Sequence, residues 1–158
     1  MLGELTIEDS ERILRAEVVG RLGCHARGRT YVVPVTYAYE DSSIFGHTGD
    51  GLKVRMMREN PAVCLEVEQL ADLPSWRSVI AFGHFEELSG DAASEALALL
   101  RARFHARTGG RGAPHEALGL WVPGEEGTRP RQAIVYAIRV HEITGRAERA
   151  PTQMRNMS

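Results

Sequence analysis

Residues 33–60 read VPVTYAYEDSSIFGHTGDGLKVRMMREN, and this stretch decides the fold that we expect. Bulky side chains occupy the odd positions from Tyr31 to Tyr39, and smaller ones occupy the even positions. This period of two predicts a strand over residues 31–39 with one face toward a core. Pro34 has no N–H to donate to a neighbouring strand, which favours an edge, a bulge or a break in the ladder. A break would leave backbone groups free to meet a ligand, and a simple edge strand is the alternative.

The second half of the stretch contains a returning strand, a glycine turn and a helix start. We expect a strand over residues 44–48, then a tight turn at Gly49 and Gly51, and a helix over residues 51–60. The first N–H groups of such a helix can receive an anion, whereas the helix dipole disfavours the positive charge of Lys53 at that end. A bound phosphate would remove this conflict. A solvated lysine on a short helix explains the residue equally well.

Three further side chains are candidates for a ligand site. His47 precedes the glycine turn, and an imidazole there can donate a proton or merely form a hydrogen bond. Trp76 and Ser78 share one face of a strand expected over residues 76–88, where a ring and a hydroxyl can meet a flat ligand. Ordinary structural roles are the alternative for all three.

The rest of the chain predicts a single domain over residues 1–158 that is mainly β. Further strands are expected over residues 18–26, 62–68 and 133–141, and helices over residues 7–16 and from Asp91 to about Phe104. Residues 108–131 are rich in glycine, proline and charge and predict a long loop with a short ordered piece at 118–122, and residues 146–158 predict a loose tail. About six strands without alternating helices favour an antiparallel sheet closed into a barrel, with two or three short helices.

Composition and charge argue against several classes of function. The net charge of -2 argues against nucleic acid and anionic lipid as main partners. The sequence has no apolar run long enough to cross a bilayer and no signal-peptide pattern, so we expect neither a membrane partner nor export, and a cytoplasmic location. Cys24 and Cys64 lie in apolar stretches and predict two reduced, buried thiols rather than a metal site.

Taken together, these segments resemble the pyridoxamine 5'-phosphate oxidase-like split-barrel flavoproteins, nearest to the flavin-nucleotide-binding and nitroimidazole-resistance branch. The resemblance runs in order from about residue 7 to residue 146. It is carried by Val19-Gly20-Arg21-Leu22, Val33-Pro34-Val35-Thr36-Tyr37, His47-Thr48, Gly51-Leu52-Lys53, Asn60-Pro61-Ala62-Val63-Cys64, Trp76-Arg77-Ser78-Val79, Gly83, Tyr136-Ala137-Ile138-Arg139-Val140 and Ile143-Thr144-Gly145. It implies a six-stranded antiparallel split β-barrel that forms a homodimer, with FMN in each of the two crevices between subunits.

The resemblance also implies roles for particular residues. Pro34, Val35, Thr36 and Tyr37 would line the flavin ring, chiefly with backbone groups. His47 and Thr48 would lie near the ring and the ribityl chain, and in the nitroimidazole-resistance group a histidine at this position is tied to activity. Lys53 and the helix start would hold the phosphate, and Trp76 and Ser78 would approach the flavin across the dimer interface.

The chain also departs from the oxidases that give this family its name. It lacks their C-terminal substrate-binding stretch with tryptophan, arginine and histidine, and their paired basic phosphate motif is reduced to Lys53. Oxidation of vitamin B6 is therefore not expected. The function that we expect is an FMN-dependent oxidoreductase passing electrons from NAD(P)H to a small acceptor such as a nitroaromatic compound. A non-enzymatic flavin-binding protein, a deazaflavin-binding barrel, or a haem-binding barrel with His47, His84 or His105 as axial ligand are the alternatives.

Overall fold

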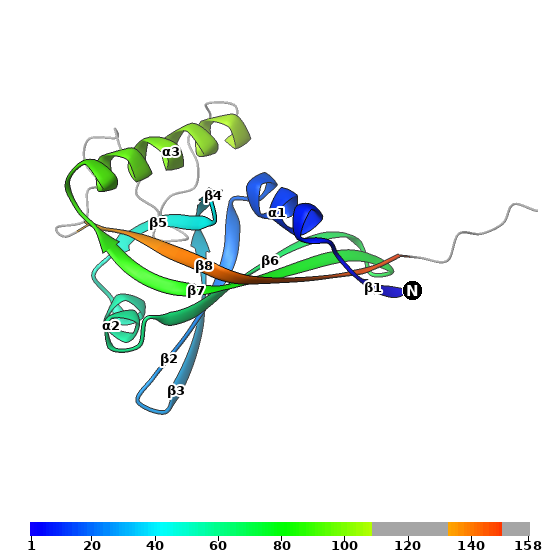
Figure 1. The fold of residues 1–158 in the computed structure, drawn as a ribbon, viewed down its shortest axis with the longest axis horizontal. Helices are drawn as coiled ribbons and strands as arrows, with labels where there is room; N and C mark the ends of the chain where they lie inside the picture. The colour runs from blue at the N-terminus through cyan, green and yellow to red at the C-terminus, as the bar shows by residue number, and fades with distance from the viewer. Residues whose placement is uncertain (109–132, 150–158) are drawn as a thin grey trace, which may run out of the picture.

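The computed structural model describes residues 1–108 and 133–149 (Figure 1). Within these ranges the chain forms one antiparallel sheet of eight strands in the order β3-β2-β6-β7-β8-β5-β4, with β1 paired to β8, and three helices. The strands are β1 (Leu2–Glu4), β2 (Val19–Ala26), β3 (Arg29–Thr36), β4 (Ala38–Glu40), β5 (Ser43–Gly49), β6 (Ala62–Asp72), β7 (Ser75–Leu88) and β8 (Ala133–Glu148). The helices are α1 (Ile7–Ala16), α2 (Leu52–Glu59) and α3 (Gly90–Thr108). The expected fold class, a mainly β antiparallel split barrel with a few helices, is confirmed.

The strand count differs from the expected six because one strand was missed and one was divided. The N-terminal β1 pairs with the end of β8. The strand expected over residues 31–39 breaks at Tyr37, whose N–H still bonds Val18 O on the β2 side at 3.0 Å. Immediately afterwards the chain pairs with β5, beginning at Ala38 opposite Phe45. One continuous alternation in the sequence therefore covers two strands, of which β3 pairs with β2 and β4 pairs with β5.

The prediction of a loose tail from residue 146 is wrong at its start. Residues 146–148 belong to β8, where β1 pairs with them on one side and β7 on the other. Pairing on both edges satisfies the backbone groups of this segment, which the sequence alone does not reveal. The rest of the expected tail from residue 150, and the expected loop with its ordered piece at 118–122, lie outside the described residues.

The core lies on one face of the sheet. It includes the fully buried Leu22, Leu65, Val79 and Tyr136. Cys24 faces this core and is buried as expected, whereas Cys64 is only half-buried. The difference follows from the register, because Cys64 pairs with Gly23 and therefore points to the opposite face from Cys24. Helix α3 packs on β5 and β8 (Figure 1). Ala96 and Leu100, which belong to the apolar stripe of this helix, are buried, as their helical spacing predicts.

Helix α1 is fixed to the point where β3 gives way to β4. Its N-cap Thr6 accepts the N–H of Asp9 at 3.1 Å. Tyr37 Oη donates to Leu14 O at 2.8 Å, and Tyr39 Oη donates to Glu11 Oε1 at 2.7 Å. Burial, with the Glu11 hydrogen bond second, raises the pKa of Tyr39 to about 12, and burial likewise raises the pKa of Tyr37. Both phenols thus remain neutral donors at ordinary pH, holding α1 beside the break in the strand.

None of the helices in the described part of the chain combines the length and apolar character needed to cross a membrane.

Candidate functional site

The barrel is split between β3 and β5. β3 is the outermost strand at its end of the sheet, and β5 pairs with β4 only along residues 43–45. The second half of β5, residues 46–49, therefore has no strand on the side opposite β8 among the described residues. β3 and β5 approach each other in space without pairing. We call the space between the edge of residues 32–36 and the edge of residues 46–49 the split.

Alternate residues on both strands direct their backbone N–H and C=O groups into the split. In an antiparallel ladder, hydrogen-bonded and non-hydrogen-bonded pairs alternate. The bond from Tyr37 N to Val18 O places the odd residues of β3 toward β2, so Pro34 and Thr36 turn their backbone groups to the free edge. This placement explains Pro34, since its missing N–H removes no bond from the β2–β3 ladder.

The same reasoning places the backbone groups of β5. Val140 N donates to Ser42 O at 2.9 Å, so the even residues of β5 turn toward β8 and the odd residues His47 and Gly49 turn away from it. Backbone groups from both strands therefore converge on the split.

The four residues predicted from β3 do not contribute equally. Val35 is 6% exposed and Tyr37 is fully buried, so their side chains pack in the core, and their ladder groups point to β2. Thr36 is 2% exposed, and its hydroxyl has no hydrogen-bond partner among the described residues. Because buried hydroxyls are normally satisfied, a hydroxyl of this kind at the edge of the split suits a ligand or an ordered water.

His47 and Thr48 are consecutive residues of β5 and point to opposite faces of the sheet. Both side chains are buried, with exposures of 5% and 6%. His47 lies on the face of its cross-strand neighbour Val135, away from the core cluster that contains Ile44. Their side chains therefore approach the split from opposite faces of the sheet.

Lys53 lies in the first turn of α2, directly after β5. The N-cap Gly51 provides no side-chain hydrogen bond, and the first turn holds no acidic residue. Lys53 is half-buried, and this burial lowers the pKa of its ammonium group, with no carboxylate of the described residues acting on it. A cation in this environment, next to unsatisfied helix N–H groups, is stabilised by a bound anion.

Trp76 and Ser78 lie elsewhere in the same chain. They line a hollow of about 670 Å³ between β7, β8 and the N-terminal segment, and none of Thr36, His47 and Lys53 lines it. Each already has a carboxylate partner: Trp76 Nε1 donates to Glu148 Oε2 at 3.0 Å, and Ser78 Oγ donates to Glu66 Oε1 at 2.8 Å. Sequence reasoning missed Glu66 and Glu148, because only the register of β6, β7 and β8 brings them to these side chains.

Comparisons with known proteins agree with the geometry. A family model described as pyridoxamine 5'-phosphate oxidase matches residues 6–147. An uncharacterized protein of Rhizobium meliloti (strain 1021) is 27% identical over 146 residues, which cover 89% of this chain and 91% of that protein.

Two solved structures share the fold. The FAD-binding protein of Mesorhizobium loti is 24% identical, with a TM-score of 0.69, over 93% of this chain and 98% of that one. A candidate 5-nitroimidazole antibiotic resistance protein of Bacteroides thetaiotaomicron is 20% identical, with a TM-score of 0.65, over 93% of this chain and 89% of that one. Since the family model spans nearly the whole chain, this protein belongs to the pyridoxamine 5'-phosphate oxidase family.

Proposed function

We propose that the chain binds FMN at the split and uses it to pass electrons from NAD(P)H to a small acceptor, such as a nitroaromatic compound. The observation that carries this proposal is Lys53, a half-buried cation without a carboxylate partner among the described residues, at a helix start without a cap. The names of the similar structures, one FAD-binding and one assigned to nitroimidazole resistance, support a flavin and a nitroaromatic acceptor. The bound flavin would supply the electron transfer.

The residues around the split suit the parts of FMN. Lys53 and the first N–H groups of α2 would hold the phosphate. The Thr36 hydroxyl and the edge groups of Pro34 and Thr36 would hydrogen-bond the polar edge of the ring. His47 and Thr48 would lie beside the ring and the ribityl chain, where His47 would bind the flavin, with proton donation as its alternative, catalytic role. Val35 and Tyr37 would hold the strand in place from the core side.

A homodimer would complete this site. Val32 is 63% exposed on the outer face of β3, near an open, mainly apolar hollow of about 430 Å³ whose lining includes Cys64 and Phe82. Trp76 and Ser78 lie on this same face of the sheet. A second copy of the chain on that face would bury the apolar surface and carry its own Trp76 and Ser78 toward the split of the first.

The phosphate assignment is tested by comparing FMN with riboflavin, which lacks the phosphate. We expect Lys53→Met to remove a charge-assisted contact worth about 1.5–3 kcal/mol, which weakens FMN binding by about 10- to 100-fold. Riboflavin affinity should not change. Arg55→Met is the matched control, since Arg55 is exposed on the same helix. Equal losses for both flavins would contradict the assignment.

The absorption spectrum of the purified protein and its response to NAD(P)H test the rest of the proposal. We expect flavin bands that bleach anaerobically on addition of NADH or NADPH and return when a nitroaromatic acceptor is added. A flavin that no nicotinamide reduces would instead identify a non-enzymatic flavin-binding protein. Haem or deazaflavin bands would refute FMN as the cofactor.

A further inference from the structure

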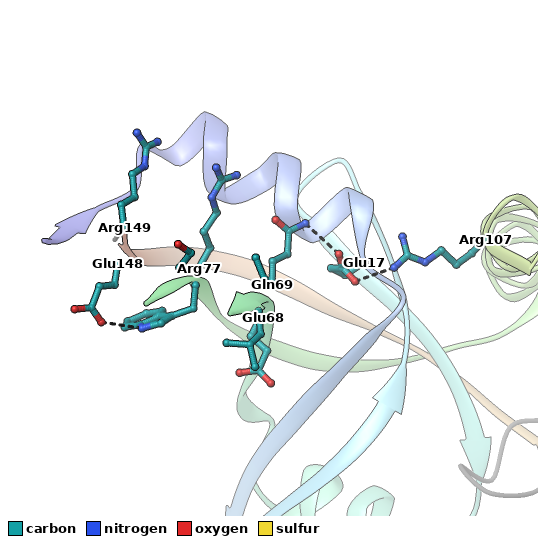
Figure 2. Close-up of a pocket in the computed structure, with 11 residues that line it drawn as sticks. Glu17, Glu68, Gln69, Arg77, Arg107, Glu148 and Arg149 are labelled. Atoms are coloured by element: carbon teal, nitrogen blue, oxygen red, sulfur yellow. Dashed lines mark hydrogen bonds and ion pairs between the residues drawn. The ribbon is translucent and has the colours of Figure 1, made fainter. Parts of the chain in front are cut away.

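A second hollow lies away from the split, where the tip of the β6–β7 hairpin meets the end of β8 and the C-terminal end of α1 (Figure 2). Its volume is about 630 Å³, which is within the usual range for small-molecule sites. It is lined by Glu17, Glu68, Gln69, Leu70, Ala71, Ser75, Trp76, Arg77, Arg107, Glu148 and Arg149. Neither Lys53 nor any residue of β3 or β5 belongs to it, and of the residues proposed to contact the flavin only Trp76 also lines it.

The register of the strands explains why this space is open and why arginines enter it. Gln69, Arg77 and Ala147 form one row across β6, β7 and β8, and therefore share a face of the sheet. Ala147 has only a methyl group, which leaves room beside Arg77. Arg149 follows Ala147 by two residues, and Figure 2 shows the side chains of Arg77 and Arg149 rising on the side of the sheet where α1 lies.

Three glutamates and three arginines line this hollow, but they are not all paired with one another. Each of its carboxylates already has a partner: Glu17 accepts from Arg107 at 3.4 Å and from Gln69 at 3.0 Å. Glu68 pairs with Arg21 at 3.3 Å, and Glu148 accepts from Trp76. Arg77 and Arg149 have no carboxylate partner within the described ranges of the chain. Two guanidinium groups therefore enter this hollow without an ion pair, although the Glu148 carboxylate, whose partner Trp76 is uncharged, also lines it.

We propose that this hollow is a binding site for a small phosphorylated molecule, with Arg77 and Arg149 as its phosphate ligands. Guanidinium groups present planar pairs of N–H donors that match the oxygens of a phosphate. Gln69 and Ser75 add polar groups at the same hollow that suit the rest of a polar ligand. Arg107 has a different role, since it bonds Glu17 and also donates to Ala16 O at 3.5 Å, at the end of α1.

The experiment titrates pyrophosphate into the purified full-length protein by calorimetry at constant ionic strength. We expect Arg77→Gln and Arg149→Gln each to weaken binding tenfold or more, and Arg77→Lys to weaken it less, since the charge remains while the planar pair of donors is lost. Arg101→Gln, an exposed arginine on α3 outside the hollow, should bind like the unmodified protein. Circular dichroism of each variant verifies that the protein is folded.

Two further arms separate this site from the flavin site and from a carboxylate site. Lys53→Met should retain pyrophosphate binding, and a loss confined to Lys53→Met would overturn the proposal. Tighter binding of malonate than of pyrophosphate would overturn the phosphate assignment. Absence of pyrophosphate binding, or binding that both Arg77→Gln and Arg149→Gln leave unchanged, would refute the site altogether.

Discussion

The backbone and the side chain of His47 point in different directions, and both directions matter for a ligand. Its backbone groups turn away from β8, toward the open side of β5, and its side chain is buried on the face away from the main core cluster. The backbone N–H and C=O groups of His47 therefore contribute to the edge of the split independently of its side chain. Substitution of the side chain alone therefore separates a role in binding from a role in chemistry.

We expect His47→Gln to weaken FMN binding while turnover per bound flavin stays nearly unchanged, because the imidazole would hydrogen-bond the flavin rather than transfer a proton, and glutamine does not reproduce the imidazole geometry. FMN titration and steady-state turnover of a nitroaromatic acceptor measure the two effects. His84→Gln, an exposed histidine on β7, is the control. Full FMN retention with turnover reduced by about 100-fold would establish His47 as the proton donor instead. A variant that keeps both affinity and turnover would leave His47 with neither role.

At the scale of elements, β8 connects the two proposed sites. It pairs with β5 beside the split and, at its other end, with β1 and β7 beside the hollow that Arg77 and Arg149 line. Its long pairing with β7 is interrupted by a bulge at residues 82–83. A bulge changes the twist and direction of a strand, so the close contact at Gly83 helps to set how the two ends of β8 are oriented.

We expect Gly83→Ala to lower the free energy of unfolding by about 1–3 kcal/mol. A methyl group at this position would overlap the backbone oxygen of Arg139 and lie 2.8 Å from Ile138 Cγ2, so the backbone must shift. Urea unfolding followed by circular dichroism measures the change. Gly3→Ala is the control, since nothing lies within 4 Å of the added methyl group. Equal stability of the two variants would show that the β7–β8 contact is not tight.

At the scale of the whole molecule, the single chain holds the proposed flavin contacts in two separate places. Thr36, His47 and Lys53 belong to the strands and the helix at the split, whereas Trp76 and Ser78 line a different hollow. Val32 remains 63% exposed on the face that carries Trp76 and Ser78. The proposed homodimer accounts for both observations through one interface.

We expect Val32→Asp to convert a homodimer into a folded monomer, because the new carboxylate would be buried without a partner at the interface. Light scattering at micromolar concentration measures the mass, and FMN binding should weaken in parallel. Leu73→Asp is the control, because Leu73 is 85% exposed and lies in the turn between β6 and β7, outside the paired strands. An unmodified protein that is monomeric at the same concentration would refute the dimer.

Local patterns predicted most of the elements. The helix at residues 7–16 was predicted with its bounds, and the strands at residues 18–26, 44–48 and 76–88 were predicted to within a residue or so of their ends. The same patterns failed where an element changes neighbours. The alternation through Tyr37 does not show that the chain leaves β2 and joins β5. The side chains of residues 146–148 do not show that this segment is paired on both edges.

The sequence by itself determined which residues alternate, which turn contains glycines, where Lys53 stands at a helix start, and which family the ordered motifs resemble. These are properties of neighbouring residues, because hydrophobic period and capping act within a few positions. Only the tertiary structure decided that β3 faces β5 across a split, that Trp76 meets Glu148 72 positions away, and that Arg77 and Arg149 enter one hollow. These depend on strand order and register, which long-range packing of the whole sheet determines, and no local pattern encodes them.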